Sequence, residues 1–247
     1  MFIDSHVHLS LFPNSKRLLN NFKERHILPL SVSVSKEDSS LNQEISNNCH
    51  NPYLIGVHPL YAKDDTLNLS EDVLINDPLC LGLGECGLDT EGSLSLDLQS
   101  SLLKKHLDLA CKFNKPISLH IRKAHGELIK LLKSYHGNVF GMIHGFTFSE
   151  DLAHRYLDLG FYLSFAPYYL KTNKGIALLK SLPKDRILLE SDGDFKNQRN
   201  YDFDYVPLGY KDLMHIFNLN EDEIIKLLSS NFKSLFFRNK PCPMFIL

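Results

Sequence analysis

The residue pattern best suited to chemistry is the histidine pair His6 and His8, which follows the apolar start of the chain. Side chains alternate between the two faces of a strand, so His6 and His8 are expected to point the same way, together with Asp4. Two imidazoles that share one small volume are typical of a divalent-metal site. The alternative for an isolated pair is one buried, hydrogen-bonded histidine beside one solvated histidine, and the rest of the sequence must decide between them.

Other titratable residues follow short apolar runs further along the chain. The runs at residues 53–57, 81–84, 117–119, 140–143 and 187–189 have the length of buried strands, and an imidazole or carboxylate directly follows the end of each. If these ends meet in space, desolvating so many titratable groups costs much free energy unless cations compensate. Two divalent metal ions are the simplest compensation. The charged or titratable residues at or just beyond these ends are His58, Glu85, Asp89, His120, Arg122, His144, Glu190 and Asp192.

The elements that must position these residues alternate between short apolar runs and longer stretches of helical period, which indicates an α/β fold. The predicted strands are residues 2–4, 28–34, 53–57, 81–84, 117–119, 140–143, 161–164 and 187–189. The predicted helices are residues 16–25, 36–48, 96–113, 126–135, 150–159 and 174–182, and a capping-box pattern at Asn220 and Glu223 begins another.

Eight strands with intervening helices in 247 residues predict a (β/α)8 TIM barrel, with one domain over residues 1–247 and the active site at the carboxyl ends of the strands. An open doubly wound sheet is the competing fold. It is disfavoured because no Gly-x-Gly-x-x-Gly turn opens a helix after a strand.

The composition sets limits on partners and location. Net charge is −2 and the sequence pI is about 6.6, so no basic footprint for nucleic acid is evident and any phosphate must be held locally. Five cysteines without a Cys-x-x-Cys pair favour reduced thiols and a cytoplasmic protein. No run is long enough to span a bilayer, so we expect no membrane association. We also expect no obligate protein partner. Cys86 is expected to be a buried thiol that faces away from the site.

Seven motifs, taken together, carry a family resemblance. They are Asp4-Ser-His-Val-His8, Gly56-Val-His-Pro59, Gly84-Glu-Cys-Gly-Leu-Asp89, His120-Ile-Arg122 with Ala124-His125, Ile143-His-Gly-Phe146, Leu157-Asp-Leu-Gly-Phe-Tyr162 and Leu188-Leu-Glu-Ser-Asp192. Through them the chain resembles the TatD-type metal-dependent deoxyribonucleases nearly from end to end. The resemblance implies a TIM-barrel metallohydrolase that hydrolyses phosphodiester bonds in DNA, often from an end.

The resemblance also implies a set of metal ligands. It assigns His6, His8 and Asp192 to one metal ion and Glu85 to a bridge, with His120 and His144 on a second ion. Imidazole and carboxylate ligands suit two divalent ions such as zinc or manganese, with magnesium a further candidate. Two such ions hold a hydroxide and stabilise the departing oxygen, and Asp192 is within reach to act as general base. Glu85 and Asp192 are therefore the predicted catalytic residues.

Residues around these ligands have less certain roles. His58 is predicted to contact substrate, with a hydrogen-bonded rim histidine as the alternative. Arg122 is either a bidentate phosphate clamp or one half of a structural salt bridge. Asp4 and Asp89 are expected to orient ligating imidazoles through their second nitrogens. The remaining histidines are expected to be solvated or capping residues: His26, His50, His106, His136, His154 and His215.

The chain departs from the family pattern close to the predicted site. Thr90-Glu-Gly follows Asp89 where aromatic residues and an arginine are usual, and Lys123 replaces an aspartate. The small residue and proline that usually follow Asp192 are replaced by Gly-Asp194-Phe, and no proline follows Arg199-Asn200. One positive group is lost, and Asp194 and Asp202 are added near the mouth, where they would repel a polyanion. The predicted substrate is therefore DNA or a smaller phosphoester.

Two other classes of function remain open from the sequence. A dinuclear amidohydrolase acting on an amide or lactone often bridges its metals with a carbamylated lysine, but the fourth strand offers Glu85 and no lysine. A non-catalytic binding protein on the same barrel is expected to have lost ligands, whereas this chain keeps the full proposed set. The apolar residues 241–247 are expected either to pack back on the barrel or to meet a partner.

Overall fold

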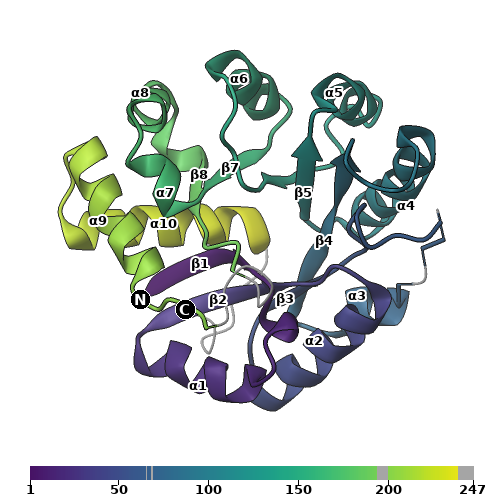
Figure 1. The fold of residues 1–247 in the computed structure, drawn as a ribbon, viewed down its shortest axis with the longest axis horizontal. Helices are drawn as coiled ribbons and strands as arrows, with labels where there is room; N and C mark the ends of the chain where they lie inside the picture. The colour runs from purple at the N-terminus through teal and green to yellow at the C-terminus, as the bar shows by residue number, and fades with distance from the viewer. Residues whose placement is uncertain (65, 68, 194–199, 239–247) are drawn as a thin grey trace.

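The strands form a single parallel sheet in which each strand pairs with its neighbour in sequence, in the order β1 to β8. This computed structural model describes residues 1–64, 66–67, 69–193 and 200–238 (Figure 1). The sheet curves into a nearly closed barrel with the helices around it, and the predicted TIM barrel is confirmed. The strands are β1 Phe2–Val7, β2 Ile27–Val32, β3 Tyr53–Ile55, β4 Cys80–Asp89, β5 Ile117–Arg122, β6 Gly141–Ile143, β7 Tyr162–Phe165 and β8 Ile187–Leu189.

The barrel closes through the segment that follows β8. Val7 pairs with Gly193 in a parallel bridge, and the His8 amide donates to the Gly193 carbonyl at 2.9 Å. The Asp192 amide donates to the His6 carbonyl at 3.0 Å. These bonds lie at the carboxyl ends of the strands, so the same contacts that close the barrel also place Asp192 beside His6.

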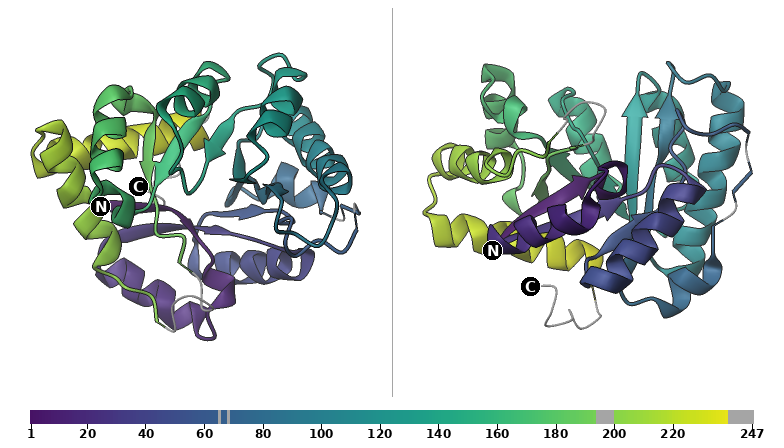
Figure 2. Two further views of the ribbon diagram at one scale, coloured as in Figure 1. Left: turned by 45° about the horizontal axis from the view of Figure 1, so that its top comes forward. Right: turned by 60° about the horizontal axis from the view of Figure 1, so that its bottom comes forward.

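The helices lie outside the strands, as the two further views in Figure 2 show. The longer ones are α1 Ser15–Glu24, α2 Lys36–Cys49, α4 Leu96–Phe113, α5 His125–Lys133, α6 Glu150–Asp158, α8 Asn173–Ser181, α9 Tyr205–Phe217 and α10 Glu221–Phe236. Four short helical segments join them: η1 Leu9–Leu11, α3 Glu71–Asn76, α7 Pro167–Leu170 and η2 Lys184–Arg186. No described helix is both long enough and apolar enough to cross a membrane.

Side-chain caps fix where several helices begin. The hydroxyls of Ser35, Ser95 and Ser149 accept the backbone N–H of the third helical residue in α2, α4 and α6. The predicted capping box of α10 is present, since Asn220 accepts from the Glu223 amide and Glu223 accepts from the Asn220 amide. The apolar face of α10 then packs against the barrel core.

Three strands extend further than the sequence analysis predicted. β1, β4 and β5 continue through His6, Glu85 and His120, respectively, to Val7, Asp89 and Arg122. A polar residue after an apolar run predicts the end of a strand, and this prediction is wrong for these three strands. The polar residues remain in the strands because their side chains pair with one another inside the barrel mouth.

Helix α9 was not predicted, because its sequence contains Pro207 and Gly209. Pro207 lies in the first turn, where a missing N–H removes no helical hydrogen bond. Gly209 is a packing requirement, since a Cβ atom there would lie 2.8 Å from the Pro167 side chain and 2.9 Å from that of Leu189. The helix can therefore approach the barrel closely at the cost of a weaker intrinsic helix preference.

Candidate metal centre

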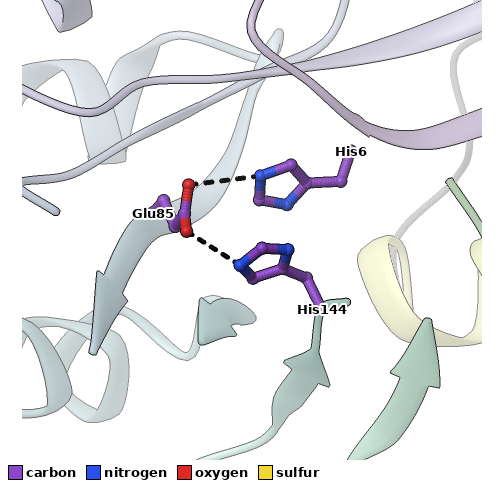
Figure 3. A group of neighbouring side chains, drawn as sticks. All are labelled: His6, Glu85 and His144. Atoms are coloured by element: carbon purple, nitrogen blue, oxygen red, sulfur yellow. Dashed lines mark ion pairs between the residues drawn. The ribbon is translucent and has the colours of Figure 1, made fainter. Parts of the chain in front are cut away.

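The carboxylate of Glu85 lies at the centre of the barrel mouth and is almost completely buried. Figure 3 shows His6 and His144 pointing at its two oxygens. Glu85 Oε1 lies 3.1 Å from His58 Nε2, 3.1 Å from His120 Nδ1 and 2.8 Å from His144 Nε2, whereas Oε2 lies 3.3 Å from Nε2 of both His6 and His8. One carboxylate thus joins five imidazoles that come from four other strands or their following loops.

Asp192 completes the cluster on the side of β1. Its Oδ1 atom lies 3.5 Å from His8 Nε2 and 3.9 Å from His6 Nε2. The residue has φ +51°, a left-handed conformation that aspartate tolerates better than most residues. Its side chain is 46% exposed, so this side of the cluster opens toward solvent. The structure therefore brings all six predicted ligand residues together.

Hydrogen bonds fix the tautomers of two of these imidazoles. His8 Nδ1 lies 2.8 Å from the Val32 carbonyl, which can only accept, so Nδ1 carries the proton. His120 Nε2 lies 3.0 Å from Asp89 Oδ2, so Nε2 donates there. In each neutral ring the other nitrogen, which faces the cluster, keeps its lone pair for a metal ion. Asp89 therefore orients His120, as the sequence analysis predicted.

His144 and His6 complete the set of four imidazoles whose free nitrogens face the cluster. His144 Nδ1 lies 3.4 Å from the buried carboxylate of Glu190, which favours a proton on that nitrogen and leaves Nε2 free. Glu190 was not predicted as a site residue, although it occurs in the last family motif, and it is held by the Gly145 amide at 2.6 Å. His6 Nδ1 lies 3.1 Å from Ser118 Oγ, and its buried Nε2 atom makes no hydrogen bond to any described residue.

His58 differs from these four imidazoles because an N–H, and not a lone pair, faces the cluster. Its Nδ1 atom accepts the Leu60 amide N–H at 3.0 Å, so the proton of the neutral ring is on Nε2 and points at Glu85. Burial lowers the pKa of His58, which keeps the ring neutral. Donor-atom proximity alone groups His58 with Glu85 and His120 as possible ligands. In this tautomer the nitrogen that faces Glu85 carries a proton, so His58 is a hydrogen-bond donor and not a metal ligand.

The carboxylates and imidazoles of the cluster shift one another's pKa values. Burial alone would raise the pKa of Glu85, but His58 and His144 hold it well below the usual value. The pKa of Asp192 is lowered to about 2, since the neighbouring imidazoles, His8 first, outweigh burial. Carboxylates next to His8 and His144 raise the pKa of both imidazoles despite burial. Protons or divalent cations must therefore balance the two carboxylates.

Asp4 does not orient an imidazole, which corrects the expectation from strand alternation. Its carboxylate accepts the Ser191 amide at 2.8 Å, the Ser191 hydroxyl at 2.6 Å and the Tyr201 hydroxyl at 2.7 Å. The pairing of β1 with β2 is irregular between Asp4 and Val7, so the simple alternation fails there. Burial raises the pKa of Asp4 to about 7. Its role is to tie β1 to the segment that carries Asp192.

A pocket of about 400 Å³ opens over the cluster and includes Arg122. The guanidinium Nη2 of Arg122 lies 2.9 Å from Glu91 Oε1, and Lys123 Nζ lies 3.5 Å from the same oxygen. Both alternatives for Arg122 therefore have support, because it lines the pocket and also forms a salt bridge. Local sequence carries no direct signal for the role of Glu91, apart from its place in a departure from the family pattern.

His106 was wrongly expected to be solvated or capping. It is fully buried on α4, where Nδ1 donates to the Leu102 carbonyl at 3.0 Å and Nε2 accepts the Val57 amide at 3.1 Å. It thereby supports the residue that precedes His58. Of the other five histidines, His50 is the left-handed C-cap of α2, as expected, and His154 is exposed beside Glu150.

Two further expectations concern residues close to Glu85. Cys86 is buried, as predicted, with Sγ 4.0 Å from the Ser118 carbonyl. Gly87 has φ +153°, and a Cβ atom there would lie 1.9 Å from the His120 carbonyl oxygen, so β4 approaches β5 closely at this point. Asp194, Arg199, Cys242 and residues 241–247 lie outside the described residues.

Comparison with known proteins decides the family. Residues 3–237 match the sequence model of a family described as TatD related DNase. The chain belongs to the TatD family. It is 31% identical over 197 residues to a putative deoxyribonuclease TATDN1 homolog of Enterocytozoon bieneusi, covering 74% of this chain and 70% of that protein. It is 33% identical over 147 residues to the 3'-5' ssDNA/RNA exonuclease TatD of Edwardsiella piscicida, covering 57% and 56%, respectively.

A solved TatD structure shares the whole fold. The crystal structure of YjjV, a TatD homolog from Escherichia coli K12, superposes with a TM-score of 0.83 at 25% identity and covers 97% of this chain and 98% of that one. Six of the seven motifs of the present chain contribute residues at the carboxyl ends of strands around Glu85, whereas the motif at residues 157–162 joins the end of α6 to the start of β7. Glu91 and Lys123, two departures from the family pattern, lie beside Arg122 at the rim.

Proposed function

We propose that this TatD-family protein hydrolyses phosphodiester bonds in DNA with two divalent cations, held by His6, His8, Glu85, His120, His144 and Asp192. The observation that carries the proposal is the arrangement around Glu85, where a buried carboxylate meets four imidazoles that can each direct a lone pair into the cluster. The name of one relative, a 3'-5' ssDNA/RNA exonuclease, supports a nucleic-acid substrate.

The donors fit a pair of cations. His6, His8 and Asp192 place one donor atom each within a common 4.8 Å, and His6, Glu85 and His144 do the same. His120 Nδ1 lies 3.2 Å from His144 Nε2, so both reach the second position beside Glu85. The buried Nε2 atom of His6, which lacks a hydrogen bond to any described residue, gains a partner once a cation binds. Nitrogen and oxygen donors together suit zinc or manganese better than calcium.

The protein's own groups then have distinct roles in the reaction. Two divalent cations, when bound, supply Lewis acidity toward a phosphoryl oxygen and make a water molecule more acidic. Asp192 stays ionised at neutral pH and faces the pocket, so its carboxylate is the proposed acceptor of the proton from the attacking water. His58 lines the same pocket, and its Nε2–H, which points at Glu85 Oε1 here, is the proposed donor to a substrate phosphoryl oxygen in place of that carboxylate once Glu85 holds the cations.

The test is hydrolysis by the purified protein with manganese or magnesium. We expect release of nucleotides from a labelled single-stranded oligonucleotide and turnover of bis(p-nitrophenyl) phosphate. Both activities should be lost with a chelator and in Glu85→Ala, with the circular dichroism spectrum unchanged. A panel of lactones run beside them separates the amidohydrolase alternative. Turnover of lactones alone would refute the nuclease proposal, and binding of DNA without any turnover would favour a non-catalytic protein.

The residue on the fourth strand supports the phosphodiesterase over an amidohydrolase whose metals are bridged by a carbamylated lysine. That strand carries Glu85, whose carboxylate would bridge the two cations without modification. A smaller phosphoester is the second candidate substrate, because the acidic Glu91 lies beside Arg122 at the rim of the pocket. The four described cysteines are free thiols, and a cytoplasmic location stays a prediction.

A further inference from the structure

We propose that Glu91 is a specificity-determining residue that competes with substrate phosphate for Arg122 and so weakens the binding of long nucleic acids. The inference rests on the proposed function, because it concerns the substrates of the same pocket. It starts from the ion pair between Glu91 Oε1 and Arg122 Nη2, whose atoms are 2.9 Å apart. A carboxylate and a phosphate use the same guanidinium donors, so Glu91 occupies a donor that a phosphate would take.

The side chain of Arg122 is more exposed than those of the cluster where the proposed cleavage takes place. The side chain of Glu85 is 3% exposed and that of His120 is 19% exposed, whereas that of Arg122 is 52% exposed. Arg122 nevertheless lines the same pocket. A guanidinium at the exposed rim suits contact with a phosphate that flanks the scissile one, and not with the scissile phosphate itself. Oligonucleotides therefore gain a contact with Arg122 that substrates with a single phosphate lack.

Glu91 also forms an ion pair with Lys123, the second basic residue of the rim. Lys123 Nζ lies 3.5 Å from the same Oε1 atom, so one carboxylate partly neutralises two adjacent cations. Lys123 has φ +58° and follows the end of β5 directly, so it and Arg122 stand side by side at the mouth. With Glu91 in place, the rim presents less positive charge to a polyanion than its basic residues alone would.

The backbone of Glu91 has a separate function that a test must preserve. Its amide donates to Asp89 Oδ1 at 2.8 Å, and Asp89 Oδ2 accepts from His120. Substitution of Glu91 by glutamine keeps this amide, the side-chain length and a carbonyl oxygen, and removes only the charge. Glu91→Gln therefore isolates the competition for Arg122 from the support of His120.

The experiment measures competition by an unlabelled single-stranded oligonucleotide against turnover of bis(p-nitrophenyl) phosphate. We expect Glu91→Gln to lower the inhibition constant of the oligonucleotide about two- to fivefold at low salt, the range of an exposed ion pair, and the gain to shrink at high salt. The kinetic constants for bis(p-nitrophenyl) phosphate should not change. In the background Arg122→Ala, the gain from Glu91→Gln should disappear.

Glu127→Gln is the matched control, since it removes the charge of an exposed glutamate in the first turn of α5. Binding of a labelled oligonucleotide, followed by fluorescence anisotropy, repeats the comparison without turnover, so a failure of the proposed hydrolysis leaves the test of Glu91 readable. An unchanged or higher inhibition constant in Glu91→Gln would overturn the proposal, since it would mean that Glu91 is neutral or orients Arg122 for substrate. An equal gain in Glu127→Gln, or a gain that persists with Arg122→Ala, would also overturn it.

Discussion

At the scale of single residues, hydrogen-bond partners on the outer side of each imidazole decide what the inner side can do. His8 and His120 donate hydrogen bonds to the Val32 carbonyl and to Asp89, which leaves a lone pair facing Glu85. His58 accepts a hydrogen bond from the Leu60 amide, which leaves an N–H facing Glu85. Histidines around one carboxylate thereby present either a lone pair, which suits the proposed metal binding, or an N–H, which suits hydrogen-bond donation.

Asp89 offers the clearest test of this division. Asp89→Asn keeps the size of the side chain, but one oxygen that accepts from His120 Nε2 or from the Glu91 amide becomes an NH2 group. We expect a loss of about 10- to 100-fold in metal affinity or turnover, the usual cost of losing a carboxylate behind a metal-binding histidine. Metal titration and steady-state kinetics measure it, with the exposed Asp97→Asn as control. Equal metal affinity in both variants would contradict the role given to Asp89.

At the scale of elements, the buried imidazole of His106 links helix α4 to the loop that carries His58. Both of its nitrogens are paired and burial lowers its pKa to about 4, so the neutral form is required in the folded state. The unfolded chain takes up the proton near pH 6.5. Between pH 6.5 and 4 the unfolded state therefore binds more protons, and stability falls as the pH falls.

The expected effect is large enough to measure. Between pH 7.5 and 5, this linkage should remove about 2 kcal/mol from the free energy of unfolding of the wild type. In His106→Gln the same pH change should lower the free energy of unfolding by about 2 kcal/mol less than in the wild type. The titrating imidazole is gone in this variant, whereas all other titratable groups are the same in both proteins. Urea unfolding at the two pH values, with a chelator present in each, gives the comparison. The same loss in both proteins would show that His106 is not held neutral.

Some elements and site residues could be predicted from the sequence and others could not, and both outcomes have a physical reason. Strand β8 was predicted with its observed ends, and barrel geometry predicted that titratable residues at strand ends meet at one rim. The set of six proposed ligand residues came from the family resemblance of the motifs. The roles of Asp4 and Glu190 could not be predicted. Asp4 depends on Ser191 and Tyr201, and Glu190 on the Gly145 amide, and such distant partners leave no mark in local spacing.

At the scale of the whole molecule, barrel closure and the candidate metal centre share the same residues. The amide of Asp192 bonds to the carbonyl of His6, while the side chains of both belong to the centre. Cations held at the proposed centre would join the first strand to the segment after the last one. Metal binding should therefore stabilise the barrel as a whole and not one loop.

Global stability gives the corresponding prediction. Manganese at about 100 times its dissociation constant should raise the free energy of unfolding by about 2.7 kcal/mol if it binds only the folded state. The increase should be smaller at low pH, because His8 and His144, whose pKa values are raised, then bind protons in competition with the metal. Thermal unfolding with and without manganese measures the effect. An identical transition in both conditions would contradict a metal-linked closure.

The most direct test of the central claim is the metal content of the purified protein, measured by elemental analysis after equilibration with manganese or zinc. The proposed centre predicts two divalent ions per chain in the wild type, and fewer in a folded Glu85→Ala variant because Glu85 contacts the donors of both positions. A wild-type protein that binds no divalent ion, or an unchanged metal content in Glu85→Ala, would contradict the account.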